Sequence, residues 1–381
     1  MKPVRFIHTS DVHLDTSFSA SGFPSRLGDR KREAIRSTFR RIIDDARSQQ
    51  VDLVLIAGDL FESERVTPDT FEFIKRQLAA LDSAQVFIAP GNHDPFVQGS
   101  PYRDDSWPKN VHIFDAEEFQ SVEIPELGVR VTGFGFVHHN LEDHFFSKLP
   151  VLSNDLFNIV VAHASDISSV PAGKSKHGPF EVSEIAGKNV RYCALGHYHQ
   201  QHRVDNTLDT ADIWYSGIPE GRGWDEEGPR GYLFGEITDN SLKLENRYCN
   251  QYPLNTLTVA CDAFATREQI LDEILLHRGS LFDSNAILRV QLVGALDSRL
   301  DLSLPELEER LTGEVLHVQW DDQTHPALDF ESLSQEKTIR GRFVRVMNER
   351  ISAASDTDRI ILERARLYGV QALSGREVRL R

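Results

Sequence analysis

Short apolar runs rich in β-branched residues recur through the first 250 residues of the chain. They occupy 4–8, 52–57, 85–89, 158–161 and 191–195. Apolar residues at helical spacing predict helices over 29–49 and 69–81, between the first of these runs. Further strands are predicted at 111–114, 129–136, 212–215, 231–237 and 242–248, without long helices between them. This mixture predicts an α/β fold, a two-sheet sandwich flanked by helices.

The pattern changes near residue 253. Strand-like runs then occur at 254–259, 286–292 and 314–320, and helical patterns at 267–277, 333–349 and 358–368. A chain of 381 residues is long enough for two domains. We therefore predict a first domain over 1–252 and a smaller C-terminal α+β cap or accessory domain over 253–381.

Five polar signatures follow the five apolar runs of the first domain. They are Asp11-Val12-His13, Gly58-Asp59, Gly91-Asn92-His93-Asp94, Ala162-His163 and Gly196-His197-Tyr198-His199. Strand ends that share one edge of an open α/β sheet open onto a common crevice, so these side chains are expected to converge. Carboxylate, amide and imidazole groups without thiolate suit manganese, iron or zinc, and they argue against a structural zinc site.

Any one of these histidines would more often be a structural residue, but five signatures at strand ends together predict a shared metal site, and the family resemblance given below implies that it is dinuclear. His8 lies inside the first apolar run, where packing in the core is expected. Two-metal hydrolysis needs a bridging carboxylate, because one anion between two cations offsets their repulsion. Asp59 is the natural bridge. His197 and His199 alternate along an extended segment, so both rings can face the same side.

The order of the signatures resembles that of the calcineurin-like metallophosphoesterases, from Met1 to about residue 250. Within that superfamily, Gly58-Asp59-Leu60-Phe61 is similar to a signature of bacterial SbcD-type and YhaO-type DNA-repair exonucleases. Trp214-Tyr215-Ser216-Gly217 followed by Glu220 is similar to a second segment of these enzymes. Some members have His where this chain has Glu62.

The resemblance implies a ligand set and a mechanism. It assigns Asp11, His13 and His199 to a first ion, and Asn92, His163 and His197 to a second, with Asp59 shared by both. The expected ions are two divalent metals, manganese first, with iron or zinc as alternatives. A water held between them is deprotonated at neutral pH and attacks phosphorus. We expect His93 to protonate the leaving oxygen and Asp94 to orient the His93 ring.

Three functions follow as alternatives. The leading one is a DNA phosphodiesterase of the repair-exonuclease type, with DNA as substrate and, by resemblance, an SMC-like ATPase as partner; a homodimer is a further expectation. The second is a phosphoesterase for a small molecule or nucleotide, and the third is a scaffold without turnover. The formal net charge of −16 favours the small substrate, because affinity for phosphate backbones comes mostly from Lys and Arg. The basic residues between Arg26 and Arg47 are interpreted as a solvated helix face.

The cysteines and the hydropathy of the chain indicate its cellular compartment. Three cysteines without CxxC spacing indicate a reducing, cytoplasmic compartment, with Cys193 buried in a strand. The chain enters a strand almost at once, so no cleavable signal is expected. No apolar run approaches the roughly 18–20 residues of a membrane span.

Overall fold

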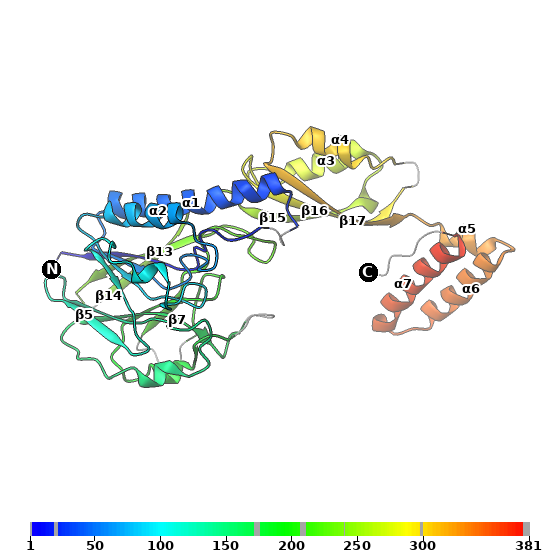
Figure 1. Cartoon of the computed structure of the whole chain (residues 1–381). Coiled ribbons are helices and arrows are strands. Elements are labelled where there is room, and N and C mark those ends of the chain that lie inside the picture. Colours follow the sequence, from blue (N-terminus) through cyan, green and yellow to red (C-terminus); the bar gives the residue numbers. More distant parts are fainter. Residues whose placement is uncertain are drawn as a thin grey trace. The chain divides into compact units, whose positions relative to one another are not determined.

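The computed structural model describes residues 2–18, 22–170, 176–205, 211–239, 241–297 and 300–375. The chain forms two compact units (Figure 1). The first contains the residues up to Asn255 together with Phe282–Ile287 and Val315–His317, and the second contains the rest. The boundary between residues 252 and 253 stays a prediction, and the sequence pattern did not suggest the two returning segments.

The first six-stranded sheet has the order β14-β13-β1-β2-β3-β4. Its strands are β1 (Val4–Thr9), β2 (Leu53–Ile56), β3 (Gln85–Ile88), β4 (Val111–Ile113), β13 (Gly231–Thr238) and β14 (Ser241–Tyr248). Strands β1 to β4 are parallel, whereas β13 runs antiparallel to β1 and to β14. Helices α1 (Ser25–Ser48) and α2 (Pro68–Ala79) connect β1 to β2 and β2 to β3 (Figure 1).

The second six-stranded sheet has the order β11-β12-β10-β7-β6-β5. Its strands are β5 (Gln120–Ile124), β6 (Val129–Phe134), β7 (Phe157–His163), β10 (Tyr192–Gly196), β11 (His202–Arg203) and β12 (Asp212–Tyr215). The four central strands are parallel, and β5 and β11 are antiparallel edges. A short pair, β8 (Ser165–Asp166) and β9 (Pro179–Phe180), and single turns of 3₁₀ helix at Pro101–Arg103, Phe145–Lys148 and Val182–Glu184 complete this unit.

The alternation of side chains along the strands divides the core of this unit into layers. Phe6 and Leu55 of the first sheet pack with Ile159 and Tyr192 of the second, so this apolar cluster lies between the sheets. Residues of the opposite face of the first sheet pack against α1 and α2, and a third cluster covers the outer face of the second sheet. The expected two-sheet sandwich flanked by helices is confirmed.

One basic residue of α1 is not on a solvated face. The Lys31 side chain is fully buried, and its Nζ donates to Glu220 Oε1 at 2.6 Å. Glu220 also accepts from Thr38 Oγ1 at 3.0 Å. Because a buried charge is stable only when it is paired, this ion pair ties α1 to the loop that carries Glu220.

The second unit is α+β. The three-stranded sheet has the order β15 (Leu254–Ala260), β16 (Ile287–Leu296) and β17 (His317–Pro326). Its helices are α3 (Arg267–Leu276), α4 (Leu304–Leu311), α5 (Phe330–Gln335), α6 (Ile339–Ser352) and α7 (Asp356–Leu373), with a 3₁₀ turn at Cys261–Ala263.

The prediction of one continuous helix over 333–349 is wrong. The chain forms α5 and α6 with a break between them, because Thr338 Oγ1 accepts the Gly341 N–H at 3.1 Å and caps the start of α6. Helix α4 was not predicted.

The helices and the cysteines bear on two further expectations, the absence of a membrane span and a buried Cys193. Among the helices that the structure describes, none combines the length and apolar character that a membrane span requires. All three cysteines are free thiols, and Cys193 is fully buried in β10, as expected.

Candidate metal centre

The five polar signatures lie at or just after the ends of β1, β2, β3, β7 and β10, and backbone hydrogen bonds join several of the segments that carry them. Asp11 N donates to Gly58 O at 3.0 Å, and His13 N donates to Asp59 O at 2.9 Å. The His197 N–H donates to both carboxylate oxygens of Asp11 at 3.1 Å. The first two signatures and the last are therefore fixed to one another before any ion is considered.

The backbone at these positions is strained. Four of the non-glycine residues with positive φ are candidate ligands: Asp11 (52°), His13 (51°), Asp59 (53°) and His197 (106°). Each such residue costs of order 1–3 kcal/mol and persists only where its surroundings hold it. Gly58, at φ 84°, is required sterically as well, because a Cβ there would lie 2.4 Å from His163 Nδ1.

Three histidines share one hydrogen-bonding arrangement. Their Nδ1 atoms lie within hydrogen-bond distance of oxygen acceptors: His13 of Glu62 Oε1 (2.8 Å), His163 of Ala57 O (3.0 Å) and His199 of Glu226 Oε1 (2.5 Å). A carboxylate or carbonyl oxygen can only accept, so each Nδ1 carries the hydrogen and donates it. In a neutral ring each Nε2 then keeps its lone pair, as in most metal-binding histidines.

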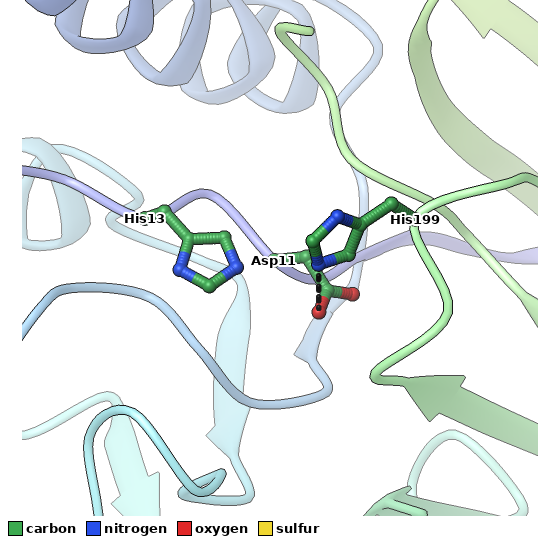
Figure 2. Close-up of side chains that lie close together, drawn as sticks. All are labelled: Asp11, His13 and His199. Atoms are coloured by element: carbon green, nitrogen blue, oxygen red, sulfur yellow. Dashed lines mark ion pairs between the residues drawn. The ribbon is translucent and has the colours of Figure 1, made fainter. Parts of the chain in front are cut away.

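The Nε2 atoms face the buried carboxylates. His163 Nε2 lies 3.4 Å and His13 Nε2 3.8 Å from Asp59 Oδ2. His199 Nε2 lies 3.8 Å from Asp11 Oδ1, and Figure 2 shows this pair beside His13. Asn92 Oδ1 lies 3.1 Å from His163 Nε2. Six of the seven predicted ligands therefore lie close together: Asp11, His13, Asp59, Asn92, His163 and His199.

His13 differs from an ordinary buried histidine. Its Nε2 is buried without a hydrogen-bond partner among the described residues. His8, also fully buried, has both ring nitrogens within hydrogen-bond distance of protein oxygens, Tyr192 OH at 2.8 Å and Leu195 O at 3.1 Å. His8 is thus the core residue expected from the sequence. A buried nitrogen lone pair without a partner costs free energy, and a metal ion would satisfy it.

The electrostatics of the cluster also fit cations. Burial opposes charge on Asp59, yet the facing His163 and His13 hold the pKa of its carboxyl well below the usual range. Burial would lower the pKa of His163, but Asp59 raises it to about 9. Burial, and then the Arg222 guanidinium, lower the pKa of His13 to about 4. A buried carboxylate needs a cation beside it, and without metal the His163 proton supplies that charge.

The candidate ligand atoms lie close enough together to bind metal ions. In Asp11, His13 and His199, and again in Asp11, Asp59 and His163, one ligand atom of each residue lies within 4.8 Å of the others. The His197 ring lies 5.2 Å from the His163 ring, and the His199 ring lies 5.3 Å from that of His13, centroid to centroid. These residues fit two neighbouring divalent ions.

His93 lies beside this cluster and is more exposed than the candidate ligands. Its backbone N–H donates to Asp59 Oδ1 at 2.9 Å, and 43% of its side chain is exposed. Its Nδ1 donates to Glu62 Oε2 at 2.8 Å. Burial opposes the charged ring, but Glu62 and Asp59 raise the pKa of His93 above its ordinary value.

The role expected for Asp94 needs correction, because Glu62 is the hydrogen-bond partner of the His93 ring. The fully buried Asp94 carboxylate accepts four other hydrogen bonds instead. The donors are Asp59 N (3.0 Å), Leu60 N (2.6 Å), Gly91 N (2.7 Å) and Tyr102 OH (2.7 Å). Burial and Asp59 raise the pKa of Asp94 to about 6. Asp94 thus fixes the two loops that carry Asp59 and Asn92.

The sequence did not reveal the roles of Glu62, Glu226 and Arg222. Arg222 Nη2 lies 3.2 Å from Glu226 Oε1, and Arg222 Nη1 lies 3.7 Å from Glu62 Oε1. Glu62 had a visible signal, because it directly follows the Gly58-Asp59-Leu60-Phe61 signature. Glu226 and Arg222 had none.

Comparison with known proteins gives the family. Residues 4–201 match the calcineurin-like phosphoesterase family. The uncharacterized metallophosphoesterase YhaO of Bacillus subtilis is 28% identical over 246 residues, which are 63% of this chain and 59% of YhaO. The DNA double-strand break repair protein Mre11 of Methanopyrus kandleri is 32% identical over 368 residues, 89% of this chain and 77% of that protein. A second Mre11, of Methanosarcina acetivorans, is 25% identical over 326 residues.

The chain spans 59% of YhaO and 48% of the Methanosarcina acetivorans protein. Among solved structures, a dimetal phosphatase from Danio rerio is similar with a TM-score of 0.42 and 12% identity, covering 64% of this chain and 96% of that one. From its matched residues and its metal-ligand groups, the chain belongs to the calcineurin-like phosphoesterase family, whose members bind two divalent metals.

Proposed function

We propose that the chain is a dinuclear metal-dependent phosphodiesterase that hydrolyses DNA, of the repair-exonuclease type. The observation that carries the proposal is the convergence of imidazole, carboxylate and amide groups at one edge of the sandwich. Three imidazoles there direct their Nε2 atoms toward two buried carboxylates. This arrangement suits metal-assisted hydrolysis rather than a purely structural site.

The proposed ligands form two sets that share Asp59. The Asp11 set contains Asp11, His13 and His199, and the Asn92 set contains Asn92, His163 and His197. Two divalent ions held there would supply a nucleophile at neutral pH and would neutralise charge on the phosphoryl oxygens. Manganese is our proposed metal, with iron or zinc as alternatives suited to the same donors. Metal analysis of protein purified without added metal tests this choice.

We assign His93 to chemistry rather than ligation. Its Nδ1 donates to Glu62, so its Nε2 is the ring nitrogen left to approach a substrate. A protonated ring in this place can give its Nε2 proton to the leaving oxygen or stabilise charge in the transition state. The Glu62 carboxylate favours that protonated ring. Asp94 holds the loops and takes no direct part.

Support for DNA as the substrate comes from relatives whose names describe DNA double-strand break repair, one of them aligned over 89% of this chain. One observation favours a small phosphoester instead: the net charge of −16. Acidic proteins gain little from the release of counterions that drives binding to phosphate backbones.

The test uses the intact chain, because Ile287 packs in the core of the first unit and a chain cut near Pro253 would lose it. Cleavage of single- and double-stranded DNA and of bis-p-nitrophenyl phosphate is measured with manganese. An Asp59→Ala protein, prepared identically, controls for contaminating nuclease. DNA cleavage that exceeds this control and falls with salt supports the proposal. Hydrolysis of the small diester without DNA cleavage or DNA binding supports the small-substrate alternative.

Two partners are proposed from the family resemblance. An SMC-like ATPase would be recovered with the tagged chain from cells that express both proteins. A homodimer would show twice the chain mass by light scattering. A DNA nuclease that remains a monomer and recovers no ATPase would overturn both partner proposals and leave the enzymatic proposal in place.

A further inference from the structure

Glu62 is shared by two histidines with different proposed roles. Its Oε1 accepts from His13 Nδ1 and its Oε2 accepts from His93 Nδ1, both at 2.8 Å. The two rings lie edge to face with centroids 4.8 Å apart. One carboxylate therefore contacts both a proposed metal ligand and the proposed proton donor.

The shared carboxylate fixes the orientation of both rings. The terminal torsion of histidine is broad and roughly two-fold, so a ring without a partner can turn over and exchange its nitrogens. Because Glu62 can only accept, each ring must direct Nδ1–H toward it. His13 Nε2 then faces Asp59 at 3.8 Å. His93 Nε2 is at the same time directed away from Glu62.

Arg222 connects this arrangement to the other carboxylate–histidine pair. Its Nη1 lies 3.7 Å from Glu62 and its Nη2 lies 3.2 Å from Glu226. Its backbone N–H donates to Glu226 Oε2 at 2.6 Å. Glu226 in turn accepts from His199 alone among the histidines of the site. The two carboxylates are held by one cation, but only Glu62 also contacts His93.

We propose that Glu62 is a positioning residue that couples the proposed metal ligand His13 to the proposed proton donor His93. Arg222 holds the carboxylates of Glu62 and Glu226 in place. This inference rests on the proposed function. It predicts that two similar carboxylates have separable effects. Glu226 acts through metal binding alone, whereas Glu62 acts through metal binding and through the chemical step.

The experiment compares Glu62→Gln and Glu62→Ala with the matched variants Glu226→Gln and Glu226→Ala. Glu184→Gln, which alters the carboxylate partner of His144 outside the cluster, is the distant control. Calorimetric titration of each metal-free protein with manganese gives affinity and stoichiometry without reference to turnover. Hydrolysis of bis-p-nitrophenyl phosphate then gives kcat at saturating manganese, and thermal melts verify folding.

We expect each alanine variant to lose about 10- to 100-fold in metal affinity, the usual effect of removing the partner of a ligating histidine. Excess manganese should restore kcat in Glu226→Ala but leave it about 10- to 100-fold low in Glu62→Ala. Glu62→Gln should be intermediate, because an amide oxygen can accept from only one of the two rings. In a His93→Ala background, Glu62→Ala should reduce kcat no further, as residues that act as one unit are not additive.

Three outcomes would overturn this inference. Full recovery of kcat by metal in Glu62→Ala would limit Glu62 to His13. Multiplicative effects of Glu62→Ala and His93→Ala would show that Glu62 does not act through His93. Loss of a third metal equivalent in Glu62→Ala would mean that His13, Glu62 and His93 bind an ion of their own. A wild-type protein that binds no metal and hydrolyses neither diester would instead refute the proposed function itself.

Discussion

The two proposed ligand sets, which would share Asp59, are built differently. In the Asp11 set, both histidines donate Nδ1–H to side-chain carboxylates, those of Glu62 and Glu226. In the Asn92 set, His163 donates to a backbone carbonyl, Ala57 O. A carboxylate partner increases the basicity of a ligating imidazole more than a neutral carbonyl does. The Asp11 set can therefore be altered by changing side chains outside it, whereas the orientation of His163 is set by the sheet itself.

The difference extends to charge. Without metal, His13 of the Asp11 set has a pKa lowered to about 4 and is neutral at physiological pH. His163 of the Asn92 set has a pKa raised to about 9 and is protonated. An ion can thus bind at His13 without displacing a proton, but it must displace one at His163. Metal binding therefore requires the loss of a proton in the Asn92 set but not at His13 of the Asp11 set.

The largest effect is expected from the residue that the sets share. Asp59→Ala should abolish turnover and the binding of both ions, because the bridging carboxylate offsets their repulsion. Elemental analysis after dialysis measures the metal. Two equivalents retained in the folded variant would show that Asp59 is not the bridge, and the two sets would then be independent sites.

The second largest effect is expected from His93, which we assign to the chemical step and to neither ligand set. His93→Ala should retain two metal equivalents and the wild-type fold, with kcat lowered by about 10²- to 10⁴-fold, the usual contribution of a positioned acid. Steady-state kinetics and metal analysis check it together. Loss of metal would move His93 into a ligand set, and unchanged kcat would remove it from the mechanism.

A glycine substitution should disturb the Asn92 set most directly, through His163. Gly58→Ala places a Cβ 2.4 Å from His163 Nδ1, so it should weaken one of the two metal sites and lower thermal stability. Gly99→Ala is the matched control, because Gly99 has the same φ of 84° but nothing within 4 Å of the added Cβ. The control should cost only about 1–2 kcal/mol, the penalty of a left-handed residue. Equal metal binding and stability in the two variants would contradict the packing of Gly58 against His163.

The smallest effect concerns protons released on metal binding. Since the pKa of His163 is about 9 in the metal-free protein, binding at pH 7.5 should release about one proton from it, and the release should disappear as the pH rises through 9. Calorimetry in two buffers with different ionisation enthalpies gives the number. In His163→Ala this proton should be lost. Equal release at pH 7.5 and pH 10 in the wild type would contradict the difference between the sets.

The sequence predicts the candidate ligands better than it predicts the residues that hold those ligands in place. Asp11, Asp59 and His163 could be predicted because each lies at or just after the end of a recognisable strand, and parallel strand ends share an edge. Glu226 and Arg222 carry no such signal, because their contacts depend on how a distant loop returns to the sheet. Ala57 offers only a backbone oxygen, which no residue type reveals. Asp94 misled the prediction because adjacency to His93 in sequence does not place their side chains together.

The same contrast holds in the fold. The apolar periods predict ten of the twelve strands of the two large sheets, where side chains are buried in distinct apolar layers, but they miss the antiparallel edge strands β5 and β11 of the second sheet. The break between α5 and α6 was missed because the apolar spacing continues through it, while the cap at Thr338 decides where the second helix begins.

The distribution of the ligands along the chain has a consequence for biosynthesis. Asp11 and His13 are translated before the other proposed ligands, whereas His197 and His199 follow only after both α1 and α2 and most strands of the two sheets. Glu226, which holds His199, comes later still. Chains are made from the N-terminus at about 5–20 residues per second, so the complete ligand set exists only seconds after the first signature appears. A ribosome-bound chain halted before His197 should therefore bind manganese weakly, and full metal loading should be a late event in the life of the nascent protein.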